Sequence, residues 1–279
     1  MLQMRDKKGY VRIAVAIFLL VFLLFPIYWM VHTSLMPTSA ILSVEPKILL
    51  DPTLINFFSY VDVFIRKPIV QWFRNSLVVT IGSATVSVVV SLFAGYSLSR
   101  YSTFGQQLMG YILLLSRMLP GALLVIPLYI IFSRMGLINS LIALMAANVT
   151  AIIPFTTWMM KGFFDGIPTE LEESGLIDGC SWFDSFYYIV LPLTVPGLAA
   201  VIIYSAILSW NEYLFARTLA YDPGAWIFTV GIASFVGEHS VSWSGLMAAG
   251  TIFIIPIIFL FFFLEPYLVR GLTAGAIKE

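Results

Sequence analysis

Long apolar segments constrain the fold of this chain more than any other feature of its sequence. Residues 13–31 form the first such segment, and five further segments follow before residue 265. An apolar run of about 18 or more residues is long enough to cross a hydrocarbon core roughly 30 Å thick. The 279-residue chain is also 60% hydrophobic and only 11% charged, which excludes a soluble globular domain. We therefore predict an all-α, polytopic membrane protein with about six transmembrane helices.

Polar and proline-containing stretches separate the expected spans. The third span contains Pro120 and Pro127, so we expect it to be kinked or locally unwound. Residues 32–74 should form an external loop with short helices, because prolines punctuate them. The first apolar segment is too long for a cleaved signal peptide, and no small-residue cleavage site follows it. The expected spans cover residues 13–31, 75–98, 108–132, 141–160, 193–215 and 244–264.

The distribution of basic residues sets the expected orientation in the membrane. A basic cluster precedes the first span, and cytoplasmic segments are typically enriched in Lys and Arg. We therefore expect both termini in the cytoplasm, with a cytoplasmic N-terminus at 1–12, a six-span domain at 13–264 and a cytoplasmic tail at 265–279. The predicted inner segments hold Arg5, Lys7, Lys8, Arg12, Arg100, Lys161, Arg270 and Lys278, and the longer outer segments hold Lys47, Arg66, Lys67, Arg74, Arg134 and Arg217.

The polar segment 167–197 interrupts the apolar pattern between the fourth and fifth spans. It has no Lys or Arg, so this acidic segment should face a partner. Pro168 suits the first position of a helix, and acidic residues in its first turn interact favourably with the helix dipole. Gly179 suits the left-handed conformation that ends a helix. The acidic residues are Glu170, Glu172, Glu173, Asp178 and Asp184.

A second short helix should follow the bend at Gly179. Ser181 and Asp184 have the spacing of a capping box, although Asp is shorter than the usual Glu. Pro192 should end this helix, because proline cannot continue the hydrogen-bonding pattern of a helix interior.

The order of residues in this segment follows a specific pattern. It reads Glu173-Ser174-Gly175-x-x-Asp178-Gly179-Cys180, followed after eight residues by Ile189-x-Leu191-Pro192. The pattern resembles the EAA loop of the membrane subunits of binding-protein-dependent ABC importers. This resemblance implies coupling helices that sit in a groove on a separate ATPase subunit, within a cytoplasmic loop at 161–192. The alternative is an ordinary amphipathic surface hairpin.

The chain departs from the EAA pattern at Ser174, Gly175 and Cys180, where the family usually has alanine. All three residues are small, so close packing is preserved. Gly175 should nevertheless loosen the first helix by about 1 kcal/mol relative to alanine.

The sequence also excludes several kinds of chemistry. No lysine is preceded by glycine, so the phosphate-binding pattern G-x-x-x-x-G-K-[ST] is absent and this chain cannot hydrolyse ATP by itself. We expect ATP and Mg²⁺ to bind a partner ATPase, and no cofactor to bind this chain. The net charge is zero, which gives no indication of nucleic acid binding, and a lone Cys180 with two distant histidines predicts no metal site.

Other segments resemble the carbohydrate-uptake branch of these importers. They are Asn75-Ser76-Leu77, Arg117-Met118-Leu119-Pro120, Trp210-Asn211-Glu212 and the C-terminal residues 271–278. The resemblance implies a multi-pass permease of a bacterial or archaeal inner membrane that moves a sugar, namely a di- or oligosaccharide, by alternating access. It also implies a second homologous permease, an ATPase dimer, an extracytoplasmic sugar-binding protein and contact with membrane lipid. The alternatives are an importer of another solute, such as a polyamine or phosphate, and an ion-gradient-driven secondary transporter.

Polar residues within the spans are candidates for the translocation pathway. Arg117 lies about nine residues into the third span, which is ~14 Å at 1.5 Å per residue and near the bilayer midplane. A charged group at that depth suggests a cavity or pathway, although pairing with a neighbouring helix is an equal alternative. We expect Ser116, Arg117, Asn148 and Thr150 to line the pathway. For Asn148, an interhelical hydrogen bond is the main alternative.

The segment Trp210-Asn211-Glu212 lies near the outer end of the fifth span. We consider these residues as an outer gate or a contact with the binding protein. The alternative is that Trp210 anchors the span at the membrane interface, a common position for tryptophan.

Overall fold

The computed structural model describes residues 2–43, 48–101, 103–237 and 241–275, with side chains described from residue 9 to residue 267. These ranges are almost entirely helical, and their only strand-like pairing is one antiparallel bridge between Val236 and Val241. The chain divides into two compact units. One contains residues 1–69 and 232–255, and the other contains residues 70–231 and 256–279.

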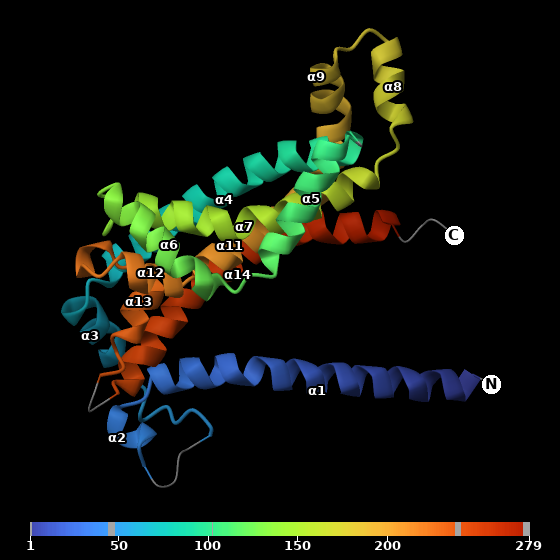
Figure 1. The fold of residues 1–279 in the computed structure, drawn as a ribbon. Helices are drawn as coiled ribbons and strands as arrows, with labels where there is room; N and C mark the ends of the chain where they lie inside the picture. The colour runs from blue at the N-terminus through green and yellow to red at the C-terminus, as the bar shows by residue number, and fades with distance from the viewer. Residues whose placement is uncertain (1, 44–47, 102, 238–240, 276–279) are drawn as a thin grey trace. The chain divides into compact units, whose positions relative to one another are not determined.

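Most of the helices follow one another with short connections, and a longer one joins α2 to α3 (Figure 1). In chain order they are α1 (Leu2–Ser34), α2 (Thr38–Ile41), α3 (Phe58–Arg66), α4 (Ile69–Arg100), α5 (Phe104–Arg117), α6 (Gly121–Arg134), α7 (Leu141–Asp165), α8 (Glu170–Ile177), α9 (Trp182–Ser185), the π-helix η1 (Phe186–Val190), α10 (Leu191–Leu193), α11 (Val195–Trp210), α12 (Leu214–Leu219), the 3₁₀-helix η2 (Pro223–Ala225), α13 (Phe228–Ala233) and α14 (Trp243–Gly275).

Four of these helices, α1, α4, α7 and α14, are individually long and apolar enough to cross a membrane. Two further spans are broken. Helices α5 and α6 meet at an angle of 102°, and the helical stretch Trp182–Leu193 meets α11 at 72°. Counting each bent pair as one span gives six spans, which confirms the predicted fold class.

The break in the third span lies at Pro120 and not at Pro127. Helix α5 ends at Arg117, and α6 begins at Gly121 directly after Pro120. Pro120 has no N–H to donate and disfavours a helical conformation at the preceding residue, so the helix must restart after it. Pro127 lies inside α6, which remains helical around it. The predicted interruption is therefore confirmed at the first proline only.

Two helix ends differ from the sequence prediction. Pro192 does not end the second loop helix, because helical backbone continues through α10 to Leu193 and the bend lies at Thr194. Proline is tolerated in the first turn of α10, where a missing N–H costs little. Helix α14 also continues to Gly275, so the predicted tail begins within a helix. Residues 276–279 lie outside the described residues.

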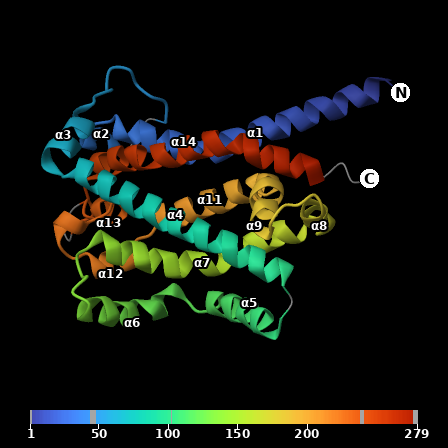
Figure 2. The ribbon, with the colours of Figure 1, turned by 90° about the horizontal axis from the view of Figure 1, so that it is seen from above.

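The larger unit is built around α7. Figure 2 shows α4 and α11 beside this helix, with α5 and α6 along its other side. Ala143, Ala147, Ile152 and Met160 of α7 are completely buried. Small residues on α4 allow close approach, and the Ser91 hydroxyl lies 2.6 Å from the Thr156 hydroxyl of α7. Small and hydroxyl side chains at such contacts are typical of helix packing in membranes.

The smaller unit contains the short helices expected in the first external loop. Helices α2 and α3 confirm that expectation. The Ser34 and Tyr60 hydroxyl oxygens lie 2.7 Å apart, and the Asn56 N–H donates to the Leu35 carbonyl at 2.9 Å. Along α1, by contrast, none of the apolar 18-residue window is buried by the chain itself.

We predict that Gly95→Ala destabilises the protein by about 1–3 kcal/mol through overpacking. A Cβ atom at position 95 would lie 2.7 Å from Met160 Cβ and 2.9 Å from the Lys161 backbone nitrogen, so α4 and α7 would have to separate. Thermal unfolding in detergent measures the effect. Gly105→Ala is the matched control, because a Cβ at that position would meet no described residue within 4 Å apart from its chain neighbours and the backbone of its own helix. Equal melting temperatures for the two variants would contradict the predicted close contact.

Candidate coupling loop and polar groups of the spans

The acidic loop forms a helical hairpin. Helices α8 and α9 project together beyond the ends of the neighbouring helices of the same unit (Figure 1). Helix α8 begins at Glu170 with Thr169 as its N-cap, so Pro168 precedes the helix and does not occupy its first position as predicted. Three glutamates lie in the first turn of α8, where their charge interacts favourably with the helix dipole.

Gly179 forms the turn between α8 and α9, as the sequence predicts. Its φ of +94° is a left-handed conformation that side chains with a Cβ rarely adopt. The Gly179 N–H donates to the Leu176 carbonyl at 3.1 Å, and the Cys180 N–H donates to the Gly175 carbonyl at 3.0 Å. These bonds satisfy carbonyl groups that the helix end would otherwise leave free.

The predicted capping box opens the second helix. The Ser181 N–H donates to Asp184 Oδ2 at 3.1 Å, and the Asp184 N–H donates to Ser181 Oγ at 3.1 Å. The reciprocal bonds confirm that aspartate can replace the more usual glutamate in this motif.

Gly175 is where the two arms of the hairpin come closest. It is buried, and a Cβ at this position would lie 2.5 Å from Ile189 Cδ1. A methyl group at position 175 would therefore require the end of the Ile189 side chain to rotate. Gly175 thus permits the present position of Ile189, a contact that helix propensity alone does not reveal.

The remaining loop residues lie on the surface of the hairpin. Glu173, Ser174, Asp178 and Pro192 are exposed, whereas Cys180 and Leu191 are half-buried. Large apolar side chains are also exposed at the tip, next to the Gly179 turn. They are Ile177, Trp182 and Phe183. An apolar tip flanked by carboxylates is typical of a surface that contacts a partner.

A buried ion pair fixes the base of the hairpin. Glu172 of α8 and Arg100 at the end of α4 are joined by an Nε–Oε1 contact of 2.5 Å, and their side chains are only 4% and 9% exposed. The Tyr96 hydroxyl donates to the other Glu172 oxygen at 2.6 Å. The carboxylate therefore has strong partners on both oxygens.

Arg100 also caps the end of α7. Its Nη1 donates to the Phe164 carbonyl and its Nη2 to the Ile167 carbonyl, each at 3.1 Å. A cation at a helix C-terminus satisfies free carbonyls and interacts favourably with the helix dipole. Arg100 thus joins α4, α7 and α8. The sequence analysis predicts Arg100 only as a basic residue of an inner segment and does not predict this role. The acidic segment 167–197 contains no Lys or Arg, which could have indicated that Arg100 pairs with it.

Arg117, Ser116 and Thr150 lie together beside the break between α5 and α6. They line a small cavity of about 120 Å³ together with Pro154. Arg117 is exposed, and its Nη2 donates to the Tyr204 hydroxyl at 2.6 Å. The hydroxyls of Ser116 and Thr150 donate to the carbonyls of Leu113 and Ala147 in their own helices.

Asn148 does not reach this cavity. It is buried, and its amide donates to Ser209 Oγ of α11 at 2.9 Å. The side chain therefore forms an interhelical hydrogen bond, which was the alternative interpretation of this residue.

Trp210, Asn211 and Glu212 make contacts within their own unit. Trp210 is only 1% exposed and packs edge-on against Phe73 with ring centroids 5.8 Å apart, so it does not reach lipid as an interfacial anchor would. The Asn211 amide donates to the Ile207 carbonyl at 2.8 Å. The Glu212 carboxylate accepts from the N–H groups of Phe215 and Ala216 at 2.6 Å and 2.9 Å and so caps α12.

Glu212 lies beyond the end of α11, in the segment that leads into α12.

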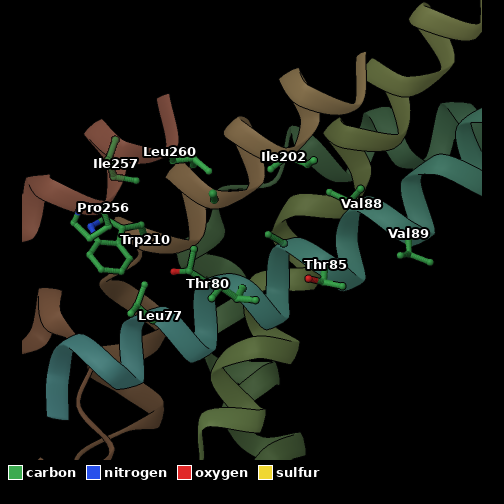
Figure 3. Close-up of a pocket in the computed structure, with 13 residues that line it drawn as sticks. Leu77, Thr80, Thr85, Val88, Val89, Ile202, Trp210, Pro256, Ile257 and Leu260 are labelled. Atoms are coloured by element: carbon green, nitrogen blue, oxygen red, sulfur yellow. The ribbon is translucent and has the colours of Figure 1, made fainter. Parts of the chain in front are cut away.

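Trp210 also forms one wall of an apolar cavity of about 370 Å³ (Figure 3). Leu77, Ile202, Pro256 and Leu260 contribute further walls from α4, α11 and α14. Thr80 is 7% exposed, and its hydroxyl has no hydrogen-bond partner among the described residues. A largely hydrocarbon lining suits an apolar chain better than a sugar, which needs many hydrogen-bonding groups.

The family of binding-protein-dependent transport system inner membrane components has a sequence model that matches residues 87–274. This chain belongs to that family. The match includes the acidic hairpin, the break between α5 and α6, and helix α11.

Relatives of this inner membrane component include permeases of sugar uptake systems. It is 34% identical to the diacetylchitobiose uptake system permease protein DasC of Streptomyces coelicolor, over 94% of this chain and 95% of that protein. It is also 34% identical to the maltodextrin transport system permease protein MdxG of Bacillus subtilis, over 75% of each chain.

A solved structure shares the fold. A chain of a bacterial ABC transporter involved in the import of the acidic polysaccharide alginate superposes with a TM-score of 0.78 at 21% identity. The match covers 94% of this inner membrane component and 96% of that chain.

We predict that Glu172→Gln weakens the hairpin anchor of this inner membrane component. Removing one partner of a buried ion pair typically costs about 3–5 kcal/mol, because the other charge remains buried and unpaired. Limited proteolysis of residues 167–193 should become faster. Glu170→Gln is the matched control, because it removes an exposed charge from the same helical turn. Equal proteolysis of both variants would exclude an anchoring role for the pair.

We also predict different thiol accessibility at positions 117 and 148. In a Cys180→Ser background, Arg117→Cys should react with a small water-soluble thiol reagent, because residue 117 is exposed beside a cavity. Asn148→Cys should remain unreactive, because residue 148 is buried between helices. Mass spectrometry of the labelled protein measures both reactions. Labelling of position 148 alone would contradict the arrangement described here.

Proposed function

We propose that this chain is one of two different permease subunits of an ATP-driven importer that moves an oligosaccharide across the inner membrane. A second homologous permease completes the pathway, and an extracytoplasmic binding protein delivers the sugar. A dimer of ATP-binding subunits supplies the energy. ATP and Mg²⁺ bind those subunits, so this chain is not itself an enzyme.

The anchored hairpin is the observation that carries this proposal. Three exposed apolar side chains at its tip, Ile177, Trp182 and Phe183, can be buried against a partner. The exposed carboxylates of Glu173 and Asp178 surround them with negative charge. Such a tip fits a groove with an apolar floor and basic rim on an ATPase subunit. The base of the hairpin is held by Glu172 and Arg100, so movement of the tip acts on the spans. The sequence contains no phosphate-binding loop, which agrees with an ATPase on a separate subunit.

The relatives support a sugar as the solute. The names of the two permeases compared above state diacetylchitobiose and maltodextrin, which differ in ring substituents and chain length. Neither name points to a polyamine or to inorganic phosphate. We therefore assign the solute to the oligosaccharides without choosing among them.

The orientation follows from the same proposal. The hairpin docks on a cytoplasmic ATPase, so the Arg100 end of α4 faces the cytoplasm. With six spans, both termini lie on that side, in agreement with the basic N-terminal cluster.

We predict that uptake requires ATP inside and binding protein outside. Proteoliposomes containing both permeases and the ATPase should accumulate radiolabelled diacetylchitobiose or maltotriose only under those conditions. Radiolabelled spermidine and phosphate serve as competing solutes. Uptake by this chain alone, driven by a proton or sodium gradient, would contradict the proposed energy source. Uptake of spermidine or phosphate in place of both sugars would contradict the proposed substrate class.

A further inference from the structure

The break between α5 and α6 exposes irregular backbone in the middle of a span. Residues 118–120 are not helical, and within the described chain Met118 is 78% exposed and Leu119 is 53% exposed. Irregular backbone at membrane depth is tolerated only where protein covers it or water reaches it, because lipid cannot satisfy its polar groups. The Met118 and Leu119 N–H groups donate to the Leu115 and Ser116 carbonyls, and Leu119 lines the same small cavity as Arg117.

Arg117, directly before the break, forms no ion pair with another described residue. Two cations elsewhere in the same unit are paired, Arg100 with Glu172 and Lys161 with Asp165. Among the described residues, Arg117 bonds only to the Tyr204 hydroxyl and, at 3.5 Å, to the Ala151 carbonyl. A guanidinium group carries five N–H donors, so donors remain available for another molecule. An exposed cation at this depth requires water, a ligand or a polar partner.

Two aromatic rings lie against the guanidinium group. The centroids of Phe155 on α7 and Tyr204 on α11 are 4.6 Å apart, and Arg117 lies 5.4 Å from the Phe155 ring centroid. Both rings are half-buried, so part of each remains accessible. We call Arg117, Phe155 and Tyr204 the arginine–aromatic cluster. It combines apolar faces, N–H donors and a phenol within one small region.

We propose that the arginine–aromatic cluster is a sugar-contact site on the translocation pathway. This inference rests on the function proposed above. The apolar faces of Phe155 and Tyr204 pack against the C–H face of a sugar ring, and free N–H groups of Arg117 donate to ring hydroxyls. Tyr204 already holds Arg117 in place, so the donors are positioned before the sugar arrives.

The composition of the cluster favours a sugar over the other solutes of membrane pathways. Arginine does not release its proton in proteins, so the cluster does not relay protons. A metal cation would be repelled by the guanidinium charge. A small inorganic anion would use the charge but not the aromatic faces. A hydroxylated ring uses both.

The test measures sugar uptake and ATP hydrolysis separately in the complete transporter. Tyr204→Phe removes only the hydroxyl, and Arg117→Gln removes the charge. The solute is whichever of radiolabelled diacetylchitobiose and maltotriose the wild-type complex transports. Uptake should fall about tenfold in both variants, as expected when a hydrogen bond to a charged group is lost. ATP hydrolysis stimulated by the loaded binding protein should stay within about twofold of wild type. Arg134→Gln, at the other end of α6, is the control and should change neither rate.

A parallel loss of uptake and ATP hydrolysis would assign the cluster a structural role and overturn the inference. Unchanged uptake in both variants would also overturn it. If the wild-type complex transports neither sugar with ATP, the proposed function itself fails. The two failures are therefore distinguishable.

Chemical labelling provides an independent readout. In a Cys180→Ser background, Tyr204→Cys should react with the cationic methanethiosulfonate reagent MTSET in the assembled complex. The transported sugar, added with binding protein, should slow that reaction severalfold. Reaction without protection by the sugar would overturn the contact. Absence of reaction in every nucleotide state would show that the second permease covers the cluster, and would also overturn it.

Discussion

The ion pair between Arg100 and Glu172 is the interaction on which the architecture of the larger unit depends. Charges are costly to bury, and such a pair is maintained only when hydrogen bonds satisfy the remaining atoms. Here the carboxylate receives Arg100 and Tyr96, and the guanidinium group reaches carbonyls at the end of α7. The pair therefore does more than join two side chains. It fixes the ends of α4 and α7 and the first turn of α8 in one arrangement.

The broken spans create a different kind of constraint. A continuous helix satisfies its own backbone, so it can face lipid on every side. The apolar window of α1, of which this chain buries none, is such a helix. The break between α5 and α6 cannot face lipid in the same way, because residues 118–120 are not helical. The adjacent Arg117 requires polar surroundings, and the same break carries the cavity lined by Ser116 and Thr150. The location of the break thus determines which side of the chain must meet water or protein.

Short-range rules predicted the local features of this molecule. The Gly179 turn, the Ser181–Asp184 capping box and the interruption at Pro120 each depend on residues within a few positions of one another. The six-span architecture follows from the length of apolar runs alone. The exceptions, Pro127 and Pro192, occur where proline is accommodated within a helix. Contacts between distant residues were beyond such rules. Arg100 and Glu172 are 72 residues apart, and Arg117 and Tyr204 are 87 apart. Trp210 likewise has the sequence position of an interfacial residue, but Phe73 and its neighbours cover it.

The close packing of α4 on α7 has a mechanical consequence. The backbones of α4 and α7 nearly touch at Gly95, and the hydroxyl pair of Ser91 and Thr156 is completely buried between them. The two helices cannot slide past each other without breaking this hydrogen bond, and burial prevents water from replacing it. This pair of helices is therefore stiff. The chain bends more easily where the helical backbone is interrupted, at residues 118–120 and at Thr194. When the hairpin moves, α4 and α7 should therefore move together as one rigid body, and the chain should bend at those interruptions.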